Sequence, residues 1–295
     1  MSDDPYAERR RLTFEQAEGI EPLPTQLQPK ELSPWLRAAL WHVIFSSLES
    51  GIQRSSMGGR SRLNDEWATI LKYVHVDRNH KMADEFENDA RKLIEEVKVI
   101  FSEGEYHTVL GFLQIVLRHR KCPYRLGEQI DHALTIGHSA YRVLDRNTII
   151  PVSSDRERAT LERAFADLAA SEFQGARSHL RSAGSELTSG NCAASVRESI
   201  HAVESVARTL EPSGQFGEAL TKLEKSTVIH SALKRGFSAI YGYTSDEKGI
   251  RHPLLDDPQS NVDEADALFM IGACASFVSY MIHKARLAGL LAQRR

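Results

Sequence analysis

Apolar residues recur at every third or fourth position over most of this 295-residue chain, and this spacing is typical of helices. The clearest run comprises Met82, Phe86, Ala90, Leu93, Ile94, Val97 and Phe101. Such a run places its apolar side chains along one stripe of a helix, which packs against a core. We therefore expect an all-α protein in which residues 82–101 form one amphipathic helix.

Further helices are expected on both sides of residue 150. Ser33 is a favourable N-cap, Pro34 suits the first helical position, and Gly51 ends this helix. The spacing also predicts helices at about residues 106–117, 126–144, 155–170, 173–188, 191–210, 216–241 and 262–290. Residues 1–30 contain several prolines and few periodic apolar positions, so we expect an extended N-terminal arm there.

The stretch "NTIIPVSSDRE", Asn147–Glu157, interrupts the helical pattern with β-branched residues and Pro151. Ser154 and Glu157 have the spacing of a capping box, which indicates the start of a new helix. The chain is also long enough for two domains. We therefore predict two helical domains, residues 1–150 and 151–295.

Charge and motifs exclude several function classes. Lys and Arg total 37 against 40 Asp and Glu, so any nucleic-acid contact must come from a local patch. No phosphate-binding loop, dinucleotide fingerprint or zinc-finger spacing occurs, which argues against an ATPase and predicts no cofactor or metal.

The N-terminal residues lack the apolar core of a secretory signal. The longest apolar stretch, "ALFMIGACASFVSYMI", is short for a bilayer crossing and reads as a buried helix. The three cysteines, Cys122, Cys192 and Cys274, read as reduced core residues. We expect a cytoplasmic protein with no membrane partner.

A polar stripe follows the core face of the helix that starts near Asn191. It consists of Arg197, His201, Glu204 and Arg208, which lie at helical spacing. A solvated face is one interpretation. In the other, Glu204 and Arg197 orient a partner loop, for which the candidate is "YGYTSDEKGIRHPLLDD", Tyr241–Asp257.

Two parts of the chain resemble known families. The run "FEQAEGIEPLPTQLQPKELSPWLRAALWHVI", Phe14–Ile44, resembles the opening of the fourth class of AbiJ N-terminal domain, found in bacterial phage-defence proteins. The stretches "VRESIHAVESVARTL", "ALKRGFSAIYGYTSDEKGIRHPLLDD" and "ALFMIGACASFVSYMIHKA" resemble HEPN domains. The second resemblance implies a small helical bundle that forms homodimers. Many HEPN domains are metal-independent ribonucleases.

The HEPN resemblance implies roles for particular residues. Arg251 falls on the motif arginine and His252 on the polar residue after it, while Asp256 stands where the motif histidine is expected. Arg251 would then hold the phosphate, His252 would move a proton, and Glu204 would orient one of them. Asp256 would serve as an acid if burial raised its pKa.

Within the polar stripe, Arg197 and His201 are the candidate substrate-binding residues. In a dimer, two facing loops would supply two histidines and two arginines to one groove. A structural interpretation of the loop is also open, in which Arg251 pairs with Asp256 or Asp257 and pins a turn.

Two functions follow from these resemblances. In the first, the protein acts in phage defence of the abortive-infection type, and its HEPN-like domain cleaves RNA without metal under control of the first domain. In the alternative, the HEPN-like domain has no catalytic role and binds a protein or nucleotide. The expected partners are RNA, a second copy of the chain, and a protein partner or antidote.

Overall fold

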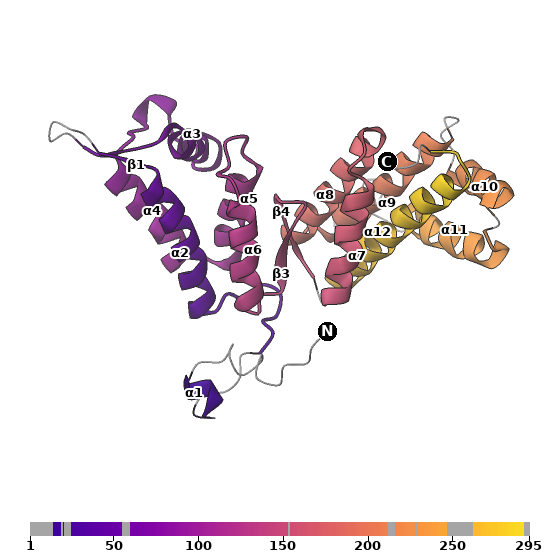
Figure 1. The fold of residues 1–295 in the computed structure, drawn as a ribbon, viewed down its shortest axis with the longest axis horizontal. Helices are drawn as coiled ribbons and strands as arrows, with labels where there is room; N and C mark the ends of the chain where they lie inside the picture. Colours follow the sequence, from indigo (N-terminus) through magenta and orange to yellow (C-terminus); the bar gives the residue numbers. More distant parts are fainter. Residues whose placement is uncertain are drawn as a thin grey trace, which may run out of the picture.

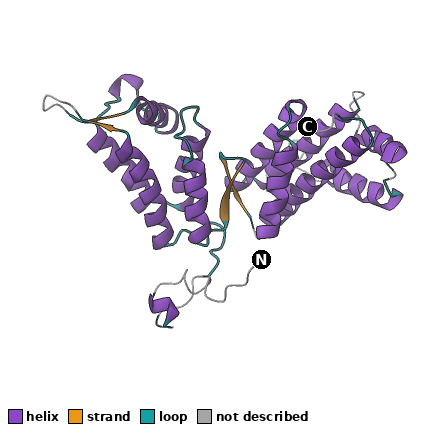
Figure 2. Ribbon diagram, in the orientation of Figure 1, coloured by secondary structure: helices purple, strands orange, loops and turns teal. Residues whose placement is uncertain are grey.

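The computed structural model describes residues 14–18, 20, 25–54, 60–152, 154–211, 216–227, 229–246 and 262–291. These residues form two helical lobes with a short β-hairpin between them (Figures 1 and 2). Each lobe has a buried apolar cluster of its own. The predicted all-α fold of two helical domains is confirmed.

The first lobe is built mainly from helices. In chain order its elements are α1 (Phe14–Ala17), α2 (Pro34–Ser50), β1 (Ile52–Gln53), β2 (Arg62–Leu63), α3 (Asp65–Tyr73), the π-helix η2 (Val74–Arg78), the 3-10 turn η3 (Ala83–Glu85), α4 (Ala90–Glu103), α5 (Tyr106–Arg118) and α6 (Leu126–Ile136). The predicted start of α2 is confirmed, because the Ser33 hydroxyl accepts a hydrogen bond from Leu36 N and Pro34 is the first helical residue.

The expected single helix over residues 82–101 is wrong in its first part. Helix α4 begins at Ala90, where the Asp89 carboxylate caps it, and Met82 is 65% exposed. The Asn88 side chain pairs with both backbone groups of Leu63, at 2.9 Å each, and so holds the residues just before α4 beside β2. These hydrogen bonds join residues 25 positions apart, so a tertiary contact overrides the apolar spacing.

The expected helix over residues 126–144 is also wrong at its end. After α6 the chain forms β3 (Tyr141–Leu144), which pairs antiparallel with β4 (Thr148–Pro151). Asp145 and Arg146 in the turn have φ values of 51° and 67°, the left-handed conformation that favours tight hairpins. A short apolar run that is buried on both sides cannot be told from a helix by spacing alone.

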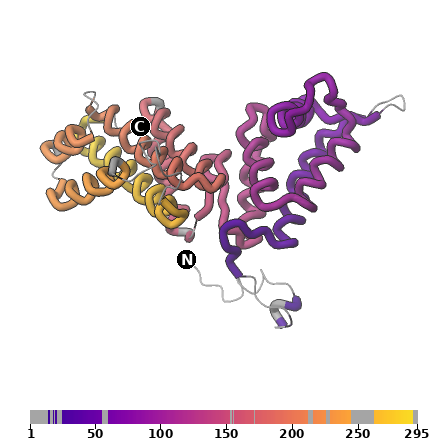
Figure 3. Tube along the Cα trace, turned by 180° about the vertical axis from the view of Figure 1, so that it is seen from behind, coloured from indigo at the N-terminus to yellow at the C-terminus, as the bar shows by residue number. Residues whose placement is uncertain are grey.

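The β3–β4 hairpin belongs to both lobes, as the views from the front and from behind show (Figures 1 and 3). Tyr141, Val143 and Ile149 contribute to the first-lobe core. Leu144 and Ile150, from the same strands, contribute to the second-lobe core. The hairpin therefore contributes side chains to both cores, and we call it the shared hairpin.

The second lobe is a bundle of helices. Its elements are α7 (Asp155–Asp167), the 3-10 turn η4 (Ser171–Phe173), α8 (Gln174–Thr188), α9 (Cys192–Leu210), α10 (Phe216–Thr227), α11 (Ser231–Asp246) and α12 (Glu264–Leu287). One expected helix, residues 216–241, is instead two, because α10 ends at Thr227 and α11 starts at Ser231.

Helix α12 is long and apolar enough to cross a membrane by length and composition. In the folded chain it packs on α9 and α7 and buries Met270, Ile271, Val278 and Met281 in the second-lobe core. A core helix of a bundle meets the same criteria.

Part of the predicted extended arm docks at the base of the hairpin. Leu27 N donates to His138 O at 2.8 Å, and Gln26 Nε2 donates to Ser139 O at 2.8 Å. Lys30 Nζ then pairs with Glu264 of α12 at 3.1 Å, so residues 25–30 contact both lobes. The single helical turn α1 lies within the stretch that was expected to be extended throughout.

Candidate functional site

Helix α9 carries the predicted site residues that the structure describes. Arg197, His201 and Glu204 are half-buried on this helix, while Arg208 is exposed. The adjoining face of α9 is fully buried against α8 and α12. Three other predicted residues, Arg251, His252 and Asp256, lie outside the described residues.

The carboxylate of Glu204 is bound from a neighbouring helix. The Tyr241 hydroxyl of α11 donates to Glu204 Oε1 at 2.8 Å, and the Tyr241 ring stacks on Phe216 at 4.5 Å. Tyr241 opens the sequence stretch that contains Arg251 and His252. The hydrogen bond therefore holds the beginning of that stretch beside the polar stripe of α9.

Two residues that sequence reasoning missed complete a second polar cluster. His179 of α8 and Glu198 of α9 lie next to the predicted residue His201. His179 Nδ1 is 2.8 Å from Glu198 Oε2, and His201 Nδ1 is 3.7 Å from Glu198 Oε1. The two imidazole rings meet edge to face, with centroids 5.2 Å apart. We call these three residues the His–Glu–His cluster.

The spacing of Glu198 and His201, three residues apart, was a signal in the sequence for half of this cluster. His179 gave no such signal, because only the packing of α8 on α9 brings it there. Its side chain is 39% exposed, compared with 21% for Glu198 and 33% for His201. One potential donor atom from each residue lies within 4.8 Å of the other two, so the cluster is a candidate for holding a metal ion.

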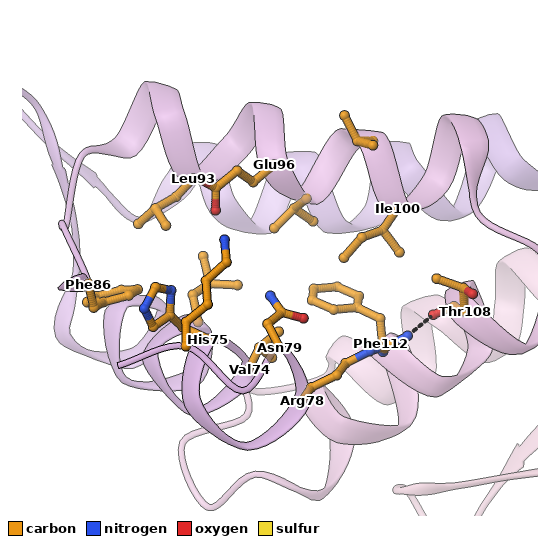
Figure 4. A pocket seen from close by; sticks show the side chains of 14 residues that line it. Val74, His75, Arg78, Asn79, Phe86, Leu93, Glu96, Ile100, Thr108 and Phe112 are labelled. Carbon is orange, nitrogen blue, oxygen red and sulfur yellow. Dashed lines mark hydrogen bonds between the residues drawn. The ribbon is translucent and has the colours of Figure 1, made fainter. Parts of the chain in front are cut away.

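The first lobe contains a separate cavity of about 380 Å³ (Figure 4). Its walls come from α3, η2, α4, α5 and the segment between η2 and α4, and they are mainly apolar, including Phe86, Ile100 and Phe112. Arg78, on the π-helix η2, also lines it, and its Nη2 donates to Thr108 O at 2.9 Å. A cavity of this size and character fits a small molecule.

Arg78 is the unusual residue of this cavity. Its Nη1 is buried and has no hydrogen-bond partner within the described part of the chain. Burial lowers the pKa of the guanidinium, which nevertheless stays protonated at neutral pH. An orphaned donor of this kind would be satisfied by an anionic or carbonyl group.

Comparison with known proteins gives one match. A family model described as AbiJ N-terminal domain 4 matches residues 12–167, which is more than half of the chain. This span covers the first lobe, the shared hairpin and α7, and it stops before the His–Glu–His cluster. No curated protein and no solved structure matches the chain.

Proposed function

The chain belongs to the AbiJ N-terminal domain 4 family. This family points to phage defence of the abortive-infection type, and we propose that the second lobe of the chain cleaves RNA without metal. The first lobe would regulate that activity. The HEPN resemblance of residues 151–295 supplies the expected chemistry.

The hydrogen bond from Tyr241 to Glu204 is the observation that carries this proposal. It joins α11, which leads in sequence to Arg251 and His252, to the stripe that holds Arg197 and His201. A half-buried carboxylate fixed by a tyrosine hydroxyl is suited to orienting an arginine or histidine. The bond therefore supports a site at which the stretch from Tyr241 meets α9.

The proposed reaction is an internal transesterification. His252 takes the proton of a ribose 2′-hydroxyl, whose oxygen then attacks the adjacent phosphorus. Arg251 stabilises the charge on the phosphorane oxygens. The P–O5′ bond breaks, and Asp256 protonates the leaving oxygen. The products are one strand ending in a 2′,3′-cyclic phosphate and another beginning with a 5′-hydroxyl.

In this proposal, Arg197 and His201 bind the RNA backbone near the reacting phosphate. The shared hairpin supports control by the first lobe, because Tyr141 and Val143 pack on one side of it and Leu144 and Ile150 on the other. A displacement of the hairpin would therefore disturb the packing of the second-lobe core. Association with a second copy through this lobe stays a prediction.

The test is an RNA-cleavage assay with the full chain in EDTA. We expect the wild type to cut labelled RNA and leave 2′,3′-cyclic phosphates, and the double variant Arg251→Ala, His252→Ala to lose at least about 100-fold in rate. Arg235→Ala is the matched control, because Arg235 is an exposed arginine of α11. It should cleave as the wild type does.

Three outcomes separate the proposals. Equal cleavage by the wild type and the double variant would show that Arg251 and His252 are not the catalytic residues. Cleavage that vanishes in EDTA would contradict a metal-free reaction. If the wild type and double variant both fail to cleave RNA yet protect cells equally from phage, the second lobe acts as an interaction module.

A further inference from the structure

We propose that the His–Glu–His cluster binds a divalent transition-metal ion of the zinc type. Two imidazoles and one carboxylate are a common donor set for zinc, and three protein ligands leave one coordination position open. The cluster joins α8 to α9. The RNA cleavage proposed above needs no metal ion, so the zinc proposal does not depend on it, although His201 takes part in both proposals.

The backbone already places the three donors on one surface. Glu198 and His201 lie one helical turn apart on α9, a Glu-x-x-His spacing that supplies metal ligands in several helical bundles. His179 faces them from α8, the helix joined to α9 by a short turn. Extensive packing between these two helices holds the backbone in place, so metal binding needs only side-chain rotation.

The donor separations are close to those that zinc requires. With bonds of about 2.0–2.2 Å, ligand atoms around a tetrahedral zinc lie roughly 3.4 Å apart. The cluster's potential donor atoms are all within 4.8 Å of one another, and the His179–Glu198 pair is already at 2.8 Å. The carboxylate would give up this hydrogen bond and place one oxygen on the metal.

The electrostatics of the cluster also favour a cation. Glu198 presents one carboxylate oxygen to each imidazole, which places negative charge between the two rings. All three side chains are partly exposed, so an ion can reach them from solvent. In the metal-free protein, the same carboxylate is hydrogen-bonded to His179 Nδ1 and lies 3.7 Å from His201 Nδ1.

The experiment is a zinc titration of the full-length protein after EDTA treatment and removal of the chelator. Binding is followed by calorimetry and by competition with a chromophoric zinc chelator. We expect one zinc per chain in the wild type. His179→Ala and Glu198→Gln should each weaken zinc affinity by at least about 100-fold, because each removes a direct ligand.

His132→Ala is the matched control, because His132 is an exposed histidine on α6, in the other lobe. It should bind zinc as the wild type does. Circular dichroism shows whether each variant is folded, and zinc should raise the melting temperature of the wild type but not of the two cluster variants.

Failure to bind zinc, or equal binding by the wild type, His179→Ala and Glu198→Gln, would overturn the proposal. Neither result bears on RNA cleavage, since that assay is run in EDTA. Conversely, loss of the proposed nuclease function would leave the zinc measurement unchanged, because the titration contains no RNA.

Discussion

At the scale of single residues, burial controls the chemistry of the three free cysteines. Burial raises the pKa of Cys122 to about 11 and that of Cys274 to about 12. The pKa of Cys192 is also raised by burial, although its thiol is partly accessible. These thiols are therefore poor nucleophiles at neutral pH. The expectation of core cysteines is confirmed for Cys274, whereas Cys122 and Cys192 are only partly buried beside the two cores.

Alkylation kinetics should show this protection. At pH 8 a thiol with a pKa of about 11 is ionised in roughly one molecule in a thousand. We expect iodoacetamide to label Cys274 most slowly, because it is only 2% exposed. Mass spectrometry of native and urea-unfolded protein would measure this. Labelling of Cys274 at the same rate in both states would contradict its burial.

At the scale of elements, the close approach of α8 to β4 depends on the absence of a side chain at Gly184. A Cβ atom at this position would collide with the Cγ2 atom of Ile150. Ile150 cannot move aside easily, because it is 1% exposed within the second-lobe core. Gly184 therefore lets the helix lie directly on the shared hairpin.

The variant Gly184→Ala should lower the free energy of unfolding by about 1–3 kcal/mol, because overpacking outweighs the better helix propensity of alanine. Gly236→Ala is the control, since a Cβ there would meet nothing within 4 Å. It should leave stability unchanged or raise it by up to about 1 kcal/mol. Urea unfolding measures the free energy of unfolding of both variants. An unchanged value for Gly184→Ala would show that the hairpin can move to accommodate the added methyl group.

At the scale of the whole molecule, polar contacts fasten the two lobes on either side of the hairpin. The Asp145 carboxylate, 6% exposed in the hairpin turn, pairs with Arg177 and Arg181 of α8. In a second contact, Arg158 of α7 in the second lobe pairs with Asp131 of α6 in the first lobe at 2.8 Å. The relative placement of the lobes therefore depends on charges from both.

Replacing Asp145 with asparagine tests this junction. Asparagine tolerates the left-handed backbone of the turn, so the change removes mainly the charge. Two partly buried arginines lose their partner, and we expect about 2–3 kcal/mol of lost stability. Calorimetry should also show the lobes unfolding less cooperatively than in the wild type. The exposed residue Asp84 provides the control variant Asp84→Asn, and equal melting of both variants would contradict the expectation.

The helical class, most helix positions and several helix ends could be predicted from the amino-acid sequence, because side-chain spacing and capping act within one or two turns. Ser33 and Pro34, for example, start α2 as expected. The polar stripe of Arg197, His201 and Glu204 could also be predicted, since these residues share one helix.

Tertiary packing determined the other features. Residues 141–144 became a strand because β4 and two cores surround them, and His179 joined Glu198 because α8 packs on α9. Contacts between distant segments leave no periodic signal in the chain, so spacing could not reveal them.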